Sequence, residues 1–199
     1  MDKRRDIARE LARRYGTLST EGLNHLTDML IPMKVNKGTI ILHEGEVCQY
    51  IYFINRGLIR QMYTKNGKEL TEHIGYEGGI IMCIESLFKQ KPSHLSIEAL
   101  EPSMLYAIPY NDFMYYAHNA FEYCNLIMSI LQESLVVSQE KADTLRFETA
   151  KERYLRTLQD HPDIIRRAPL HIVASYLQMT PETLSRVRTA TSESVGKND

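Results

Sequence analysis

The stretch that decides the fold is residues 37–74, KGTIILHEGEVCQYIYFINRGLIRQMYTKNGKELTEHI. Short runs rich in isoleucine, tyrosine and threonine alternate here with glycine, and seven of the chain's ten glycines lie between Gly38 and Gly79. Asn66-Gly67 is a strong hairpin signal because both residues tolerate a positive φ. Short strands separated by glycine turns predict an antiparallel sandwich or roll.

The sequence on either side extends this picture. HLSIEAL (94–100) and SMLYAIP (103–109) predict two more strands, while residues 2–15 predict a charged helix and Ser19 and Thr20 can cap a second one. Residues 111–148 contain neither glycine nor proline, and apolar residues recur there at helical spacing, which predicts a long helix over 119–148. We interpret its stripe as a dimer seam; the alternative is packing against the roll. The seam residues are Cys124, Ile127, Leu131 and Leu135.

Three further helices are predicted in the C-terminal part. Thr149 and Glu152 match a capping box, so a helix should run from there to about Asp160, before Pro162. Pro169 opens the next helix, and Pro181, capped by Thr180, opens the last one, over residues 181–190. Because a turn of about three residues joins the last two helices, the pattern is that of a helix-turn-helix.

The last helix has a face suited to DNA. At about 100° per residue with Leu184 inward, Val187 also faces inward while Glu182 and Arg186 face outward. Glutamate can accept from cytosine N4, arginine can donate to guanine O6 and N7, and free N–H groups at the helix start can bind a phosphate. The alternative is an exposed Glu–Arg pair of little consequence. The expected DNA-binding residues are Thr180, Glu182, Ser185, Arg186, Arg188 and Thr189.

Composition excludes several other classes. The net charge of −1 gives no strongly basic footprint, and without a signal peptide or an apolar run the protein is expected to be cytoplasmic and to have no membrane partner. The three widely spaced cysteines form no CxxC, which argues against a metal site. An enzyme is the weakest interpretation, because the chain lacks a phosphate loop and a nucleophile–base pairing. His43 and Glu44 lack the second histidine of a cupin metal site.

The order of these parts resembles the Crp/Fnr superfamily of bacterial transcription regulators. Three stretches carry the resemblance: residues 37–74, SIEALEPSMLYAIP (96–109) and VASYLQMTPETLSRVR (173–188). It implies an α+β fold: a cyclic-nucleotide-binding-like β-roll (jelly roll) with flanking helices over 1–118, a dimerisation helix over 119–148 and a small all-α helix-turn-helix domain over 149–199. It also implies an effector-responsive homodimer that reads a palindromic site, with Glu182 and Arg186 at base-reading positions. The expected partners are double-stranded DNA, a second copy of the chain, RNA polymerase and a small-molecule effector.

The chain departs from this family in three places. Cyclic-nucleotide members hold the ligand with Gly-Glu and Arg-Ser or Arg-Thr, where this chain has Gly79-Ile80 and Ser93-His94, so no cofactor is expected, cyclic AMP least of all, and the effector is unknown. Gln178 replaces a turn glycine, at a cost of roughly 1 kcal/mol if its φ is positive. TSESVGKND (191–199) is too short and polar for a winged hairpin, so the domain is expected to lack a full wing.

The alternative function is a ligand-binding module without sequence-specific DNA binding. Two possible arrangements of the C-terminal helices distinguish a DNA-binding regulator from a ligand-binding module. One basic surface with Glu182 exposed, and dimer partners placing two such helices about 34 Å apart, favours DNA binding. That surface would comprise Arg166, Arg167, Arg186 and Arg188. Packing of the last helices against the β-roll favours the ligand-binding module.

Overall fold

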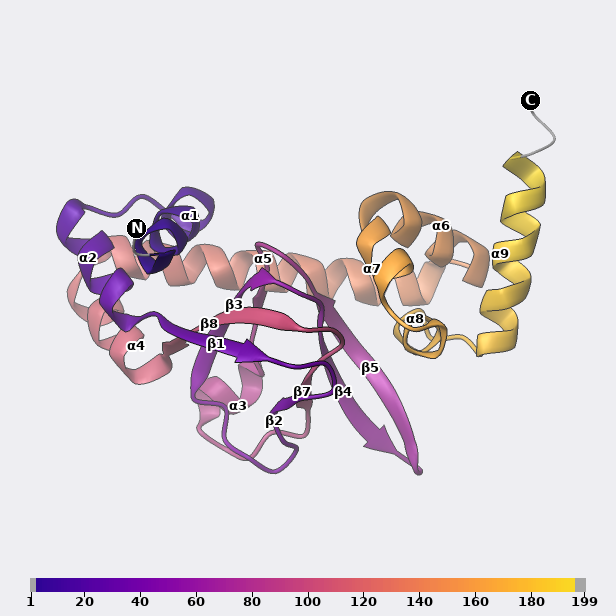
Figure 1. Ribbon diagram of the computed structural model, residues 1–199, viewed down its shortest axis with the longest axis horizontal. Coiled ribbons are helices and arrows are strands. Elements are labelled where there is room, and N and C mark those ends of the chain that lie inside the picture. Colours follow the sequence, from indigo (N-terminus) through magenta and orange to yellow (C-terminus); the bar gives the residue numbers. More distant parts are fainter. Residues whose placement is uncertain (1–2, 196–199) are drawn as a thin grey trace.

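A computed structural model describes residues 3–195 of the chain, with side chains up to Thr191 (Figure 1). Two helices, α1 (Lys3–Tyr15) and α2 (Thr20–Met29), precede the first strand. The Ser19 hydroxyl accepts a hydrogen bond from the Gly22 N–H, which caps α2. Both predicted N-terminal helices are therefore confirmed.

Two four-stranded antiparallel sheets form the β-roll, in the orders β1-β8-β3-β6 and β2-β7-β4-β5. The strands are β1 (Ile31–Val35), β2 (Ile40–Leu42), β3 (Tyr50–Arg56), β4 (Ile59–Lys65), β5 (Lys68–Gly75), β6 (Ile80–Ile81), β7 (Ser96–Ala99) and β8 (Ser103–Pro109). The predicted hairpin is confirmed, since Lys65 pairs with Lys68 and both Asn66 and Gly67 have positive φ. The sequence analysis missed β1, which contains Pro32, and β6, which has two residues.

The main core lies between the two sheets and continues under the flanking helices. Phe53 of β3, Ile97 of β7 and Tyr106 of β8 are almost completely buried in it. Leu11 of α1 and Leu26 of α2 belong to the same cluster. The helices that precede the roll in sequence are therefore part of the same packed unit.

A short helix, α3 (Ile84–Lys89), follows β6, and two helices follow β8. The glycine-free segment after Pro109 is not one helix, because it divides at Ala120 into α4 (Tyr110–Asn119) and α5 (Phe121–Phe147). The first half of α5 packs into the main core. Ile127 is only 6% exposed there, so its assignment to the dimer seam is wrong: this side of α5 is covered by the protomer itself.

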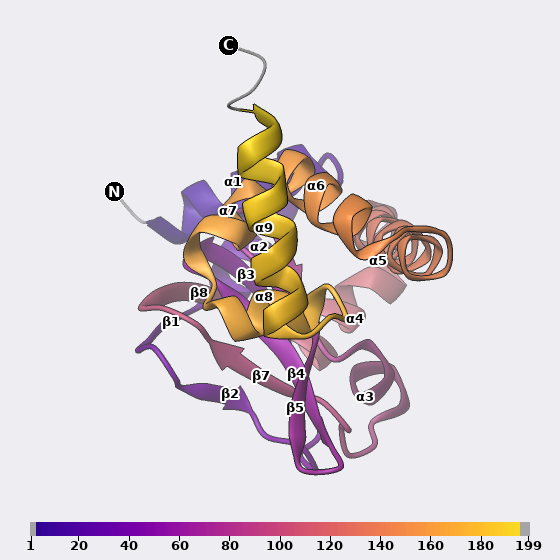
Figure 2. The ribbon, with the colours of Figure 1, turned by 90° about the vertical axis from the view of Figure 1, so that its right-hand side faces the viewer.

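The C-terminal part contains α6 (Ala150–Asp160), α7 (Pro162–Arg167), α8 (Leu170–Tyr176) and α9 (Pro181–Val195). The predicted capping box is present, with Thr149 and Glu152 bonded reciprocally. The sequence analysis missed α7, because Pro162 takes the first position of a new short helix instead of ending the structure. The last helix also continues to Val195, past the expected end at 190, while residues 196–199 of the predicted tail lie outside the described residues. Figures 1 and 2 place α9 at the end of the molecule, away from the β-roll.

Candidate nucleic-acid interface and effector cavity

The turn between α8 and α9 is held by Arg153, a residue that the sequence analysis missed. Its guanidinium donates to the carbonyl oxygens of Leu177, at 2.9 Å, and Glu148, at 2.7 Å. Gln178 has φ +51°, as expected at the position where relatives place glycine. Because Arg153 is on α6, the turn is fixed to the helix beneath it, and α9 leaves the turn in a defined direction.

One face of α9 is buried and the opposite face is exposed, as predicted. Leu184 is fully buried with Tyr154 and Val173, and Val187 packs against the same cluster. Thr180 caps the helix, accepting from the Thr183 N–H at 3.2 Å. Five of the six expected DNA-binding residues are exposed on or beside the opposite face, and the sixth is the exposed cap itself. These residues are Thr180, Glu182, Ser185, Arg186, Arg188 and Thr189.

The outward face presents one anionic acceptor and one forked cationic donor. Hydrogen bonds from the backbone at the helix start and from the Thr180 hydroxyl lower the pKa of Glu182, with a smaller contribution from Arg186. The Arg186 guanidinium donates to the Thr183 hydroxyl at 3.3 Å. Both side chains project from the first turns of the helix, where the partial positive charge of the helix N-terminus favours an anion such as a phosphate.

Arg167 does not join this face. It makes charge-assisted hydrogen bonds to both carboxylate oxygens of Glu77, at 2.7 and 2.9 Å, and to Glu101 at 2.6 Å. Burial alone would raise the pKa of Glu77, but the bonds from Arg167 and the Gly57 N–H outweigh it and lower the pKa to about 2. Arg166 pairs with Asp163 within α7. The single surface of four arginines that would favour DNA binding therefore does not include Arg167, which is bound to the β-roll.

The sequence left open whether the C-terminal helices pack on the β-roll or stand away from it, and the structure contains helices of both kinds. Ile164 of α7 and Ile172 of α8 are buried against Leu58 and Ile74 of the β-roll. The Ser175 hydroxyl accepts from the Thr71 N–H of β5 at 2.8 Å. Only α7 and α8 lie on the roll in this way, whereas α9 packs on α6 and α8 and keeps its outward face free of the roll (Figure 2).

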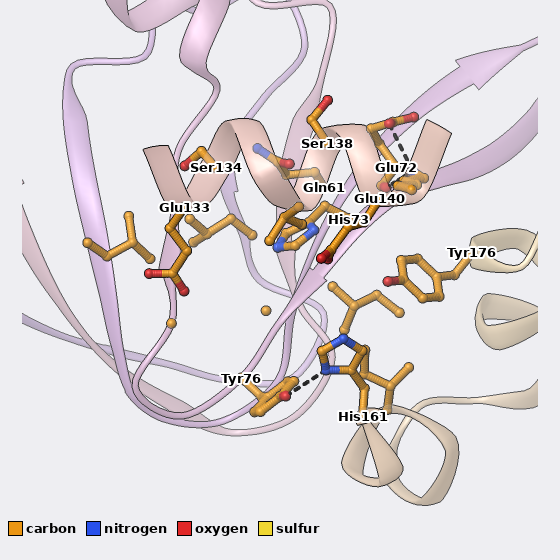
Figure 3. A pocket seen from close by; sticks show the side chains of 18 of the residues that line it. Gln61, Glu72, His73, Tyr76, Glu133, Ser134, Ser138, Glu140, His161 and Tyr176 are labelled. Atoms are coloured by element: carbon orange, nitrogen blue, oxygen red, sulfur yellow. Dashed lines mark hydrogen bonds and ion pairs between the residues drawn. The ribbon is translucent and has the colours of Figure 1, made fainter. Parts of the chain in front are cut away.

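A cavity of about 540 Å³ lies where the β-roll, α5 and the C-terminal helices meet (Figure 3). Gly79 and Ile80, two of the expected effector residues, line it. Ser93 and His94 do not: the Ser93 hydroxyl is tied to the backbone of Leu95, and the His94 side chain is largely exposed. The predicted four-residue pocket is therefore not a single site.

Two histidines face this cavity from different domains. His73, on β5, is partly buried, and burial together with the positive charge of Lys141 and the nearby His161 lowers its pKa to about 4. His161, at the start of α7, is 2.8 Å from the Tyr76 hydroxyl through Nδ1 (Figure 3). At neutral pH His73 is thus an uncharged imidazole that can donate or accept.

Residues 3–195 contain neither a candidate metal site nor a helix suited to cross a membrane. No group of three or more His, Cys, Asp or Glu side chains there is placed to hold a metal ion. Cys48 and Cys83 are buried, and Cys124 is partly buried on α5. No helix in this part of the chain is long and apolar enough to span a bilayer.

Comparison with known proteins extends the geometric picture. Residues 32–119, less than half of the chain, match the family model of the cyclic nucleotide-binding domain. No curated protein sequence matches the chain significantly. Many solved structures do, and one of them is the regulatory domain of Toxoplasma gondii PKA with cyclic AMP.

Three structures illustrate the likeness. The catabolite activator protein of Thermus thermophilus is 22% identical, with 93% of this chain and 87% of that chain aligned and a TM-score of 0.56. FixK2 of Bradyrhizobium japonicum is 19% identical over 83% and 85% of the two chains, with a TM-score of 0.71. A protein of Eubacterium rectale assigned to the Crp/Fnr family of transcriptional regulators is 19% identical over 88% and 85%, with a TM-score of 0.69.

At these identities the likeness shows a shared fold, and it extends well beyond the matched domain into the C-terminal helices. The β-roll, the long helix and the helix-turn-helix occur in the order that the sequence predicts. Residues 32–119 are similar to the cyclic nucleotide-binding domain family, and the chain shares its fold with these solved structures, one of which is assigned to the Crp/Fnr family.

Proposed function

We propose that the protein is a transcription regulator that acts as a homodimer, responds to a small-molecule effector and reads a palindromic DNA site with α9. The outward face of α9 carries this proposal. Glu182 and Arg186 are exposed on a helix whose other face is anchored by Leu184 in the helix-turn-helix core. These are suitable side chains for base edges in the major groove, and the exposed helix start suits a backbone phosphate.

The dimer is proposed to form along α5. Phe121, Cys124, Met128, Leu131 and Leu135 follow one another at alternating spacings of three and four, which is the heptad pattern of a two-stranded coiled coil. Phe121, Met128 and Leu135 are exposed, with Phe121 at 80% and Leu135 at 64%, whereas Cys124 is partly buried and Leu131 packs partly against the core. In this seam Met128 replaces the buried Ile127. A two-fold dimer of this kind would place two copies of α9 on half-sites about 34 Å apart.

Site selection from a random duplex library, followed by titrations across salt, tests the DNA proposal. Arg186→Ala should weaken binding to the selected site by about 1–3 kcal/mol and relax one base position in each half-site. Arg188→Ala, the matched control, should weaken selected and random DNA alike and lower the salt slope by about one unit, as expected for a phosphate contact. Equal losses on both kinds of DNA for Arg186→Ala would remove it from the base-reading role.

The second candidate function is a ligand-binding module without sequence-specific DNA binding. The contact of α7 and α8 with the β-roll, including the Thr71–Ser175 hydrogen bond, favours it. The same selection experiment separates the two functions, because a module of this kind enriches no sequence. RNA polymerase stays a predicted partner that follows only from the family resemblance.

Cyclic AMP is not proposed as the effector. Ile80 offers no acceptor for a ribose hydroxyl, and Ser93 has neither the charge nor the position to bind a phosphate. A phosphate moved out of water without a cationic partner is strongly disfavoured. Calorimetry should find no binding of cyclic AMP or cyclic GMP tighter than about 1 mM, or about −4 kcal/mol. Micromolar affinity for either nucleotide would refute this.

A further inference from the structure

The cavity at the domain junction has walls from several parts of the chain. His73, Ile74 and Ile81 come from the β-roll, Val137 and Lys141 come from α5, and further residues come from α1, α3 and the C-terminal helices. Figure 3 shows Tyr176 and His161 of the C-terminal helices facing His73 and Gln61 across this space. A ligand here would contact the sensor domain and the DNA-binding domain together.

The positive charges that line the cavity are already engaged. Four Lys or Arg side chains line it, and each has protein partners at hydrogen-bond distance. Arg14 bonds Glu133 and the Gly78 carbonyl, Lys141 bonds Glu72, Arg153 bonds the Leu177 and Glu148 carbonyls, and Arg156 bonds Glu148. Arg14, Lys141 and Arg156 each bond a carboxylate, and Arg153 bonds only backbone carbonyls, so an anionic ligand would compete with a carboxylate for the first three and with the carbonyls of the turn for the fourth.

The negative charges are not all engaged. Glu140 on α5 and Asp160 at the end of α6 both line the cavity, and neither makes a hydrogen bond or ion pair with the described residues. Both act on Arg156 at longer range. Because His73 is neutral, it adds no positive charge to the wall. The lining therefore has two exposed carboxylates without a hydrogen-bond partner among the described residues, whereas each of its four cations already has at least one bonded partner.

The rest of the wall suits an apolar or aromatic body. Isoleucine side chains from both domains line it, and the Tyr176 ring already has one ammonium group near its face, with Lys141 Nζ 5.8 Å from the ring centroid. A tyrosine ring can attract a second cation in the same way, through its electron-rich face. Ser134, whose hydroxyl donates to the Ile130 carbonyl, also lines the cavity (Figure 3).

We propose that this cavity binds a small organic cation, an amine on an apolar or aromatic body, with the ammonium group at Glu140 and Asp160. The inference rests on the proposed role of the β-roll as an effector sensor and specifies the chemical class of that effector. Since the ligand spans both domains, its binding favours the arrangement in which α7 and α8 lie on the roll.

Three probes of similar shape and different charge test the proposal on the full chain at pH 7. They are 2-phenylethylamine, which is cationic, 3-phenylpropanamide, which is neutral, and 3-phenylpropanoate, which is anionic. Calorimetry should find the amine bound at least tenfold more tightly than the carboxylate, with the amide between them. Glu140→Gln should weaken amine binding about three- to tenfold, while leaving amide binding unchanged.

Asp143→Asn is the matched control, because it removes the same charge from the same helix at an exposed position outside the cavity lining. It should leave amine binding unchanged. Three results would overturn the inference: carboxylate binding as tight as amine binding, an equal loss in both variants, or no binding of any probe at about 10 mM, where a millimolar ligand occupies most sites. DNA titrations without the probes report on the α9 proposal separately, so the two can fail independently.

Discussion

Leu135→Asp should separate the proposed dimer into folded protomers. Leu135 is 64% exposed on α5 and belongs to the heptad stripe. Ile127 lies on a different face of the same helix, is 6% exposed and belongs to the protomer core. Substitution at these two positions should therefore have different consequences. An aspartate at 135 remains in water in the monomer, but an aspartate at 127 must be buried within it.

The expected magnitude follows from the burial. Covering a leucine side chain is worth about 1.5–3 kcal/mol, so the exposed two thirds of Leu135 contribute about 1–2 kcal/mol in each protomer, or about 2–4 kcal/mol in the dimer. Since each 1.4 kcal/mol changes an equilibrium constant tenfold, the dimer dissociation constant should rise about 30- to 700-fold from the lost apolar contact alone. Two facing carboxylates, deprived of water, add to this loss.

Sedimentation velocity over a range of protein concentrations measures the dissociation constant, and circular dichroism checks that the protomer is folded. Leu135→Asp should be monomeric and helical, with a normal unfolding transition. Ile127→Asp should instead unfold, since burying an unpaired carboxylate costs several kcal/mol, a large part of the stability of a domain. A Leu135→Asp protein with an unchanged dimer dissociation constant would show that the seam is elsewhere.

Three further predictions concern the domain junction and the turn. The pKa of His73 is about 4 in the folded protein and about 6.5 when unfolded, so stability should be complete above about pH 6.5 and fall toward pH 4 by at most about 3 kcal/mol. The His73→Gln variant should lose less stability than the wild type in denaturant titrations at about pH 5. A loss in the variant as large as that of the wild type would assign the effect to other groups. Gln178→Gly should leave stability unchanged or raise it by up to about 1 kcal/mol, because φ is +51° there, and a marked loss of stability would contradict the strain argument. Arg167→Ala should speed hydrogen exchange of the Thr71 amide about tenfold by loosening α7 and α8, while Arg166→Ala should not, and equal rates would show that Arg167 does not hold this contact.

The parts that sequence predicts well are those specified by local signals. Asn66-Gly67 fixes a hairpin through the positive φ of two adjacent residues, and the Thr149–Glu152 box fixes the start of α6 through bonds that span one turn. The inward position of Leu184 likewise follows from helical period alone. Each of these three predictions depends on only a few residues that are close together in the sequence.

The proposed dimer seam on α5 is a feature that local sequence patterns do not predict. Periodicity identifies α5 as amphipathic but does not say which of two adjacent apolar stripes the protomer covers itself. Helices α1 and α4 pack on α5, and α2 contacts it through a residue far away in the sequence, because the Tyr123 hydroxyl donates to the Gly22 carbonyl. That contact, which no local pattern contains, turns Ile127 inward and leaves the neighbouring stripe with Leu135 outside.

The domain junction is the part that sequence could not supply. Arg167 and Glu77 are 90 residues apart, and nothing near either residue marks the other as its partner. The same holds for the cavity, whose lining is completed only when α7 and α8 lie on β5. The pattern of the family's nucleotide site groups Gly79 and Ile80, which line the cavity, with Ser93 and His94, which the fold directs elsewhere.

One helix connects these separate features. The first half of α5 is in the core with Tyr123, its exposed stripe with Leu135 is the proposed seam, and its second half gives Val137 and Lys141 to the cavity. Just past its end, Glu148 accepts from Arg153, the residue that fixes the turn before α9. In the proposed dimer, α5 would connect the cavity, the partner protomer and α9, because a change in the tilt of this helix at the cavity would also move the turn that Arg153 holds.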